Sequence, residues 1–446
     1  MASLLSLSAE LKLGIIEQLN HTSTSFIPAP PQELLSLSRV CKTLRSLTLP
    51  YLFKDITLLN EGKNGASVLA TLKGPYGEHV RSIHYIGIMA MAESPDERDE
   101  PPTKPAPEHL PDSVEHVLSN LAKFPNLERV IVEFRCAKTA EEDNSIHQSS
   151  YDIFEELEDS AQVLEAEEND AFRALIKRSY DAVARNSVGT IRSLEMRNTV
   201  AKECSTWWSQ EFHALLGALT DFTISLRGGD NGAGWRVNMV PAYLGFIRDL
   251  TSLFFRHLNK VKRFRFAATD DGPPGIDDGM NNTRLELGED NMNALEILEL
   301  EQVFISRELA TFISSHSSSL KSVRLVKCYS GADEDDAITW ADFFSTITEE
   351  TTSRIGIQDF IIGISDLEMT QSHDLAAGAY THDQSVQAKE LREQYPGRRM
   401  FDYKIIDDKY GMLFDSEGLA FDRFQDGTDH EGWEQLCAML KKSSEA

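Results

Sequence analysis

Few residues of this chain have the spacing that phosphate-binding loops or metal sites require. The stretch 228–234 holds four glycines and follows a strand pattern, as a phosphate-binding loop does. It lacks the Gly-x-Gly-x-x-Gly spacing, however, and no helix pattern begins directly after it. The run 415–418 lacks the ligand order of a calcium loop, and the twelve histidines form no pair with metal-ligand spacing. We therefore interpret 228–234 as a flexible loop and expect neither a metal ion nor a cofactor.

Enzyme signatures are also absent from the sequence. No Walker loop, His-Glu-x-x-His, Cys-x-x-Cys or Gly-x-Ser-x-Gly motif occurs in the chain. We therefore assign no catalytic residue and expect the protein to act by binding rather than as an enzyme.

A repeated apolar pattern runs through the middle of the chain. An apolar residue is followed three and five positions later by two more, in segments that read as short strands. The eight triplets are Val80, Ile83, Tyr85; Leu127, Val130, Val132; Ile191, Leu194, Met196; Leu219, Phe222, Ile224; Val261, Phe264, Phe266; Leu295, Leu298, Leu300; Leu320, Val323, Leu325; and Ile357, Phe360, Ile362. Helical patterns lie between most of them. This alternation predicts an α/β fold with parallel strands.

Charged residues stand between and just after the members of these triplets. Alternate residues of a strand face opposite sides, so the triplets should face the core and the charged residues should face away from it. The charged candidates are Arg129, Glu133, Glu195, Arg197, Arg263, Arg265, Glu299, Glu301 and Arg324. Mixed charge of this kind suits recognition of a protein surface. The alternative is a solvated sheet face without a ligand.

The series of strands and helices resembles an irregular leucine-rich-repeat solenoid. In such a fold each unit buries its apolar face on the next, and the charged residues above would lie on a concave face that binds a target protein. The alternative is a compact doubly wound α/β domain without repeat symmetry.

Two amphipathic helices are predicted near the N-terminus, the first capped by Ser8 and the second spanning 33–47. Pro50 is predicted to end the second helix. The apolar positions are Leu11, Ile15, Ile16 and Leu19 in the first helix and Leu34, Leu37, Val40, Cys41, Leu44 and Leu47 in the second. A helix pair of this length cannot build an adequate core alone, so it needs a partner surface.

These two helices followed by repeats resemble the F-box proteins that are common in fungi. The resemblance implies an N-terminal F-box-like domain that docks on a Skp-family adaptor and, through it, on a cullin. It assigns adaptor contact to Leu7, Ser8, Glu10, Leu11, Ile15, Leu34, Leu37, Val40, Cys41 and Leu44. The alternative is that the helices cap the domain that follows them.

The resemblance implies that the chain recognises the substrate of a Skp-cullin-F-box ubiquitin ligase, with the repeats binding an unknown target protein. A protein-interaction scaffold that never reaches a cullin is the alternative.

Composition restricts the partners and the compartment. A net charge of −27 repels phosphate backbones and anionic membranes, so neither nucleic acid nor a membrane is an expected partner. The chain opens with no leader pattern, and no apolar stretch reaches the roughly 18 residues of a membrane helix. Five scattered cysteines predict reduced thiols rather than a disulfide framework. We therefore expect a cytoplasmic or nuclear protein.

Three regions follow from these patterns: an F-box-like helical domain at 1–57, the repeats at 58–365, and a C-terminal cap with an acidic tail at 366–446. The repeats should carry two inserts, a proline-rich disordered loop near 93–108 and an acidic, partly helical segment at 139–170. The stretch 270–282, with its prolines and glycines, is predicted as a further mobile loop. A helix around Trp433 should close the chain.

Overall fold

Strands and helices alternate along the chain in the computed structural model, which describes residues 7–19, 31–90, 110–137, 157–231, 233–276, 282–331, 338–351, 355–363 and 389–444. The chain divides into two units. The first comprises Met1–Ala137 and Ala166–Arg197, and the second comprises Lys138–Glu165 and Asn198–Ala446.

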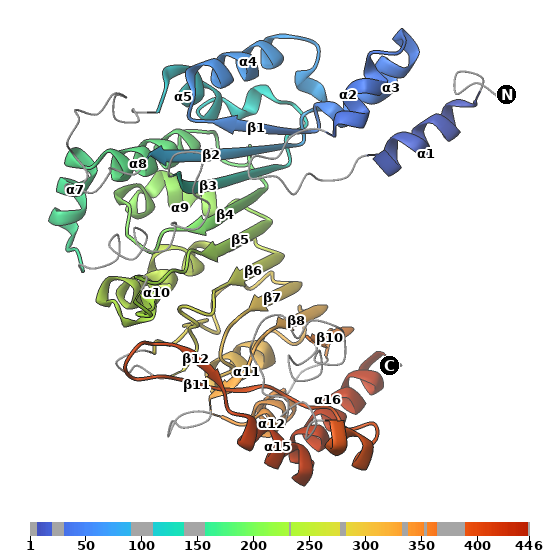
Figure 1. The fold of residues 1–446 in the computed structure, drawn as a ribbon, viewed down its shortest axis with the longest axis vertical. Helices are drawn as coiled ribbons and strands as arrows, with labels where there is room; N and C mark the ends of the chain where they lie inside the picture. Colours follow the sequence, from blue (N-terminus) through green and yellow to red (C-terminus); the bar gives the residue numbers. More distant parts are fainter. Residues whose placement is uncertain are drawn as a thin grey trace. The chain divides into compact units, whose positions relative to one another are not determined.

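The first unit begins with three helices and continues with parallel strands (Figure 1). Its elements are α1 (Ala9–Leu19), α2 (Gln32–Ser38), α3 (Lys42–Leu52), β1 (Asp55–Leu59), α4 (Gly62–Lys73), η2 (Gly77–His79), β2 (Ser82–Ala90), α5 (Asp112–Leu118), η4 (Leu121–Lys123), β3 (Arg129–Ala137), α8 (Ala171–Ala184) and most of β4 (Ser193–Thr199). Helix α7 (Ser160–Asn169) spans the boundary between the units. Strands β1 to β4 pair in parallel in the order in which the chain makes them.

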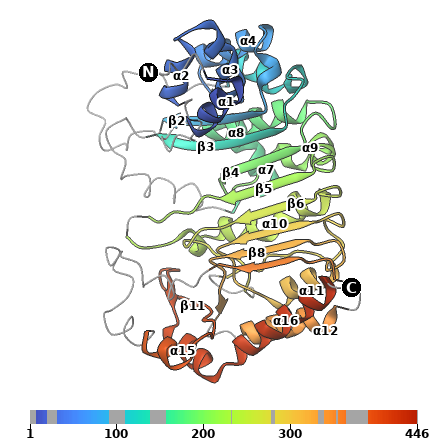
Figure 2. The same ribbon diagram turned by 90° about the vertical axis from the view of Figure 1, so that its right-hand side faces the viewer.

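The second unit repeats this arrangement and ends in a helical segment (Figure 2). Its elements are η6 (Ser205–Trp208), α9 (Gln210–Leu216), β5 (Asp221–Leu226), η7 (Val237–Met239), α10 (Pro241–Leu253), η8 (Phe255–His257), β6 (Arg263–Ala267), β7 (Ile297–Glu301), α11 (Arg307–Ser315), β8 (Ser322–Val326), β9 (Ser330–Gly331), α12 (Trp340–Glu350), β10 (Asp359–Ile362), β11 (Tyr403–Ile406), β12 (Leu413–Asp415), α15 (Glu417–Asp426) and α16 (Thr428–Ser444). Strands β5, β6, β7, β8 and β10 are parallel neighbours in that order.

The predicted α/β fold with parallel strands alternating with helices is confirmed. Sequential strand order within each unit differs from the order reversal of a doubly wound sheet and is consistent with a solenoid. All eight triplets are buried. Their middle members share one register level in the second unit, where Phe222, Phe264, Leu298, Val323 and Phe360 follow one another across the strands. Burying each such side chain contributes about 1.5–3 kcal/mol.

Side chains of the helices complete the apolar core behind the triplets. In the second unit, the Phe254 ring stacks on Phe222 of β5, and Phe255 meets Phe264 of β6 edge to face. In the first unit, Phe134 of β3 contacts the ring of Phe172 on α8. Edge-to-face and stacked rings contribute about 0.5–1.5 kcal/mol beyond their buried area.

Polar caps determine where several helices begin. The Asp170 carboxylate accepts hydrogen bonds from the backbone N–H groups of Phe172 and Arg173, at 2.9 and 2.8 Å, and so starts α8. Thr339 and Asp342 form a reciprocal capping box at the start of α12. Such caps contribute about 1 kcal/mol each and fix the boundary between a strand and the helix that follows it.

A left-handed residue recurs at the same place relative to three triplets, inside the end of β4 and directly after β7 and β8. Asn198, Gln302 and Lys327 have φ values of 49°, 56° and 48°, and each lies two positions after the last member of a triplet. The residue that follows each of them is buried. One of these, Cys328, places its thiol 3.6 Å from the Leu300 carbonyl of the preceding repeat. The turn that leaves these strands is therefore a repeated structure, which the apolar triplets alone do not reveal.

Two expectations for the N-terminal helices are wrong. The stretch predicted as one helix forms α2 and α3, because Cys41 is extended (φ −159°) and its thiol caps α3 by accepting from Leu44 N–H. Pro50 does not end α3, which continues to Leu52. A proline in the last turn removes only one donor, and the Phe53 N–H still reaches the Leu49 carbonyl at 3.1 Å.

Most of the described part of the predicted mobile loop at 270–282 is packed, although Asp270 is exposed. Pro273, Pro274 and Gly275 are buried, and Gly275 N–H donates to the Thr283 carbonyl at 2.8 Å. Gly275 has a φ of 127° and lies against the Phe304 backbone, so a side chain there would clash. The predicted insert at 93–108 lies outside the described residues. Of the insert at 139–170, the structure describes 157–170, which includes α7.

The C-terminal segment packs on the last repeat of the second unit. Strand β11 pairs with β9 in parallel and with β12 in antiparallel orientation. The Trp433 ring of α16 contacts Phe344 of α12 and Phe360 of β10. Arg399 donates to the Ile362 carbonyl, at 2.6 Å. The predicted helix around Trp433 is therefore present. The three predicted domain boundaries stay predictions.

Candidate protein-binding surfaces

The three N-terminal helices are held by caps and by polar contacts between them. Ser8 Oγ accepts from Leu11 N–H at 3.4 Å, as the sequence predicts for an N-cap. The Tyr51 hydroxyl of α3 donates to the Glu17 carboxylate of α1 at 3.2 Å. Helices α2 and α3 pack side by side (Figure 1).

The apolar side chains of these helices separate into an inner and an outer set. The inner set is Ile16, Leu34 and Leu44, with relative exposures of 0, 0 and 1%. The outer set is Leu11, Ile15 and Val40, with exposures of 59, 37 and 62%. Leu11 and Ile15 are four residues apart on α1 and therefore share a face. The outer set is apolar surface that the described residues leave in contact with solvent.

This separation corrects part of the predicted adaptor contact. Leu34 and Leu44 are inside the unit and cannot touch another protein without rearrangement. Among the other predicted contacts, five are exposed and three are partly exposed, on or beside the same helices. The exposed residues are Ser8, Glu10, Leu11, Ile15 and Val40. The partly exposed residues are Leu7, Leu37 and Cys41.

The charged strand face of the first unit is a buried ion-pair cluster. Glu133 of β3 is only 1% exposed. Its carboxylate accepts from His84 Nε2 at 2.8 Å and from Arg135 Nε at 2.6 Å. Glu195 of β4 is 7% exposed and pairs with Arg129 and Arg197. The predicted residues Arg129, Glu133, Glu195 and Arg197 therefore come together, but the two glutamates are not open to a partner.

Hydrogen bonding decides the protonation of Glu133. Burial by itself would raise the pKa of this carboxyl, but the hydrogen bonds from His84 and Arg135 outweigh it and lower the pKa to about 2. Glu133 is therefore ionised at neutral pH. A buried ionised carboxylate needs both partners, because an uncompensated charge inside a protein costs several kcal/mol.

The charged strand face of the second unit is open to solvent. Arg263, Arg265 and Arg324 have side chains that are 62, 47 and 48% exposed. Arg265 Nη2 lies 2.8 Å from a Glu301 oxygen, and Arg324 Nη1 lies 3.5 Å from a Glu299 oxygen. The structure thus brings Arg263, Arg265, Glu299, Glu301 and Arg324 together as neighbouring ion pairs across β6, β7 and β8.

Sequence reasoning missed some members of these clusters. His84 lies between the triplet members Ile83 and Tyr85, so the same alternation rule would have placed it on the charged face. Glu296 lies just before β7, and its carboxylate bridges Lys262 and Lys321 at 2.7 and 2.5 Å. Each of these three directly precedes a strand and follows the first member of a triplet, so it lies within the window that the triplets define.

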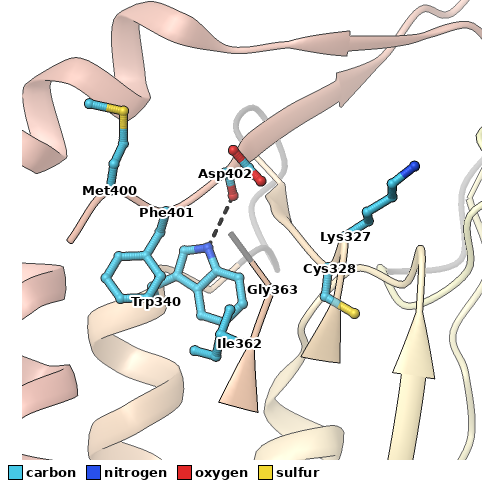
Figure 3. Close-up of a pocket in the computed structure, with 8 residues that line it drawn as sticks. All are labelled: Lys327, Cys328, Trp340, Ile362, Gly363, Met400, Phe401 and Asp402. Carbon is cyan, nitrogen blue, oxygen red and sulfur yellow. Dashed lines mark hydrogen bonds between the residues drawn. The ribbon is translucent and has the colours of Figure 1, made fainter. Parts of the chain in front are cut away.

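One cavity in the second unit is too small for a ligand. It lies where α12, the ends of β8 and β10, and residues 400–402 meet (Figure 3). Trp340 Nε1 donates to the Asp402 carbonyl beside it, at 3.0 Å. Its volume of about 10 Å³ is at the lower limit for one water molecule. This region is packing between the C-terminal segment and the last repeat.

A larger cavity in the second unit lies between η6, α9 and α10. Its volume is about 190 Å³, and it is lined by Glu203, Trp207, Trp208, His213, Asp249, Ser252, Leu253 and Arg256. The ring of His213 stacks on that of His257, with centroids 3.6 Å apart.

Metal-ligating side chains do not cluster in the described part of the chain. No group of three or more described His, Cys, Asp or Glu residues could hold a metal ion. No described helix is long and apolar enough to cross a membrane. In the glycine-rich stretch, Asp230 and Arg236 form a β-bridge, and Gly228 lies against Thr269. Cys41, Cys204, Cys328 and Cys437 are free thiols.

Comparisons with known proteins give this chain no relative: no protein-family model matches it, and no curated protein matches it.

Proposed function

We propose that this chain is the substrate-recognition subunit of a Skp-cullin-F-box ubiquitin ligase. Helices α1 to α3 dock on the Skp-family adaptor, and the adaptor links the chain to a cullin. The repeats hold the target protein. The chain makes no bond itself, because its contribution is to raise the effective concentration of target lysines near the conjugating enzyme.

The observation that carries this proposal is the outer apolar set of α1 to α3. Leu11 on α1 and Val40, in the turn between α2 and α3, are about three-fifths exposed, although Ile16, Leu34 and Leu44 of the same helices are buried. Fully burying such a side chain against a partner contributes about 1.5–3 kcal/mol. A helix pair that only capped its own unit would have no use for a second apolar face. These positions are also among those that the F-box resemblance assigns to adaptor contact.

The repeated turn after the strands supports the leucine-rich-repeat part of the proposal. A left-handed residue followed by a buried one recurs at the end of β4 and after β7 and β8. A structure that repeats in both its strands and its turns is the arrangement that builds a long binding surface from stacked units. In this proposal the exposed ion pairs around Arg265 and Glu299 contact the target.

Co-purification with a Skp-family adaptor tests the proposal. The full chain is co-expressed with the adaptor as the wild type and as the double variant Leu11→Asp, Val40→Asp. A matched double variant, Leu164→Asp, Val188→Asp, changes residues that are 48 and 66% exposed outside α1 to α3. We expect one-to-one binding by the wild type and the matched control, and loss of binding by the first variant. Circular dichroism checks that all three chains are folded.

A cullin separates the ligase from a scaffold that only binds the adaptor. Adding a cullin to the purified pair should give a ternary complex that the adaptor bridges. A pair that never recruits the cullin would favour the scaffold, and a wild-type chain that never binds the adaptor would overturn the proposal.

A further inference from the structure

The 190 Å³ cavity beside η6 and α10 has a composition that none of the binding surfaces above explains. Two indole rings, Trp207 and Trp208, line it together with two carboxylates, Glu203 and Asp249. Pockets for drug-sized molecules measure roughly 300–1,000 Å³, so this volume suits a single side chain better than a cofactor.

Two acceptors in the cavity have no partner in the described structure. The Asp249 carboxylate forms no ion pair and accepts no hydrogen bond from the described residues. His213 Nε2 is buried and has no hydrogen-bond partner among them. His213 also hydrogen-bonds to the Trp207 backbone, which occupies its other ring nitrogen and leaves Nε2 as the acceptor of a neutral ring.

The charge of the cavity is negative. Glu203 and Asp249 supply two carboxylates, and Arg256 supplies one guanidinium. Arg256 Nε lies 3.1 Å from His257 Nε2 and so is already engaged with that ring. Burial lowers the pKa of both His213 and His257, which keeps the stacked pair neutral near pH 7. The ligand that complements this site is a cation with several hydrogen-bond donors and a flat face.

We propose that this cavity binds an arginine side chain of a partner protein. A guanidinium carries five N–H donors in one plane, so it can pair with the Asp249 carboxylate while its face lies on an indole. The negative charge of the whole chain, −27, attracts basic partners to the site. The inference is independent of adaptor docking, which uses helices of the other unit.

The probe for this site is Nα-acetyl-arginine amide, titrated into the full chain and followed by tryptophan fluorescence and calorimetry. Its neutral isostere, Nα-acetyl-citrulline amide, has the same shape without the charge. We expect saturable binding of the arginine probe and binding of the citrulline probe that is about tenfold weaker or absent. Equal binding of the two probes would overturn the proposal, and so would failure of the arginine probe to saturate.

Two variants assign the binding to the cavity. Asp249→Asn should weaken the arginine probe about tenfold, because the variant keeps the shape of the side chain and removes its charge. Asp290→Asn makes the same charge change at an exposed position that does not line the cavity, and it should leave the affinity unchanged. An equal effect of the two variants would show general charge attraction and contradict the site. A lysine probe that binds as tightly as arginine would contradict the assignment to arginine.

Discussion

The carboxylates on the charged strand face are buried in one unit and partly exposed in the other. In the first unit Glu133 and Glu195 are 1 and 7% exposed, and each is surrounded by cationic side chains. In the second unit the glutamates at the equivalent positions of β7, Glu299 and Glu301, have side chains that are each 29% exposed. One sequence pattern, a charge between apolar triplet residues, therefore produces a structural ion-pair cluster in one place and an accessible surface in another.

Removing the Glu133 charge should have the largest effect. Glu133→Gln leaves the Arg135 guanidinium without its carboxylate inside the first unit, so we expect a loss of about 3 kcal/mol in the free energy of unfolding. Glu301→Gln, at an exposed ion pair of the second unit, should cost less than about 1 kcal/mol. Urea denaturation of both variants measures the difference. Equal losses in the free energy of unfolding would contradict the difference that we infer between the two units.

The acid stability of the first unit should depend on the same carboxylate. The pKa of Glu133 is about 2 in the folded chain, against 4.5 for the ordinary group. Its stabilisation is therefore complete above pH 4.5 and is lost as the pH falls from there to about 2, by roughly 3 kcal/mol. Thermal unfolding across this range should show a steep decline for the wild type. Glu133→Gln should flatten that decline, and an unchanged slope would contradict the assignment.

The second unit should respond at a higher pH. Burial lowers the pKa of His213 and of His257 from the ordinary 6.5, so the unfolded chain binds protons more readily than the folded one. Stability is then fully present above pH 6.5 and declines as the pH falls below it, because protonation would place two cations in a stack 3.6 Å apart. His213→Gln should reduce this decline between about pH 7 and pH 5. If the stability of the variant declines as much as that of the wild type, groups other than His213 cause the decline.

The smallest effect is expected at the exposed ion pairs. Arg324→Ala removes a side chain that is 48% exposed and 3.5 Å from Glu299, so its effect on the free energy of unfolding should stay below about 1 kcal/mol. If the open face binds the target, this variant lowers target affinity without lowering stability. A loss of several kcal/mol in urea denaturation would show that this face is structural, as it is in the first unit.

The sequence predicted the parts of the fold that depend on burial alone. Every triplet residue faces the core, because alternation along a strand fixes which side is apolar. The same rule could not tell an open charged face from a buried one, since it says nothing of what covers Glu133. Periodicity also read α2 and α3 as one helix, because the apolar spacing continues through the extended Cys41. The left-handed turns at Gln302 and Lys327 carry no glycine to mark them.

The candidate binding sites could be predicted only in part for the same reason. Leu11 and Leu34 are equivalent in an amphipathic pattern, yet one is 59% exposed and the other is fully buried. The cavity beside α10 collects side chains from segments 40 to 50 residues apart, such as Glu203 and Asp249, which no local motif connects.

Hydrogen–deuterium exchange of the full chain with and without a Skp-family adaptor tests the central claim most directly. We predict that binding slows exchange in α1 to α3, residues 9–52, and leaves the strands β6, β7 and β8 unchanged, because the adaptor and the target use different surfaces. Protection confined to the strands, or no protection anywhere under conditions that saturate a known F-box protein, would contradict the proposed docking and with it the function as a ligase subunit.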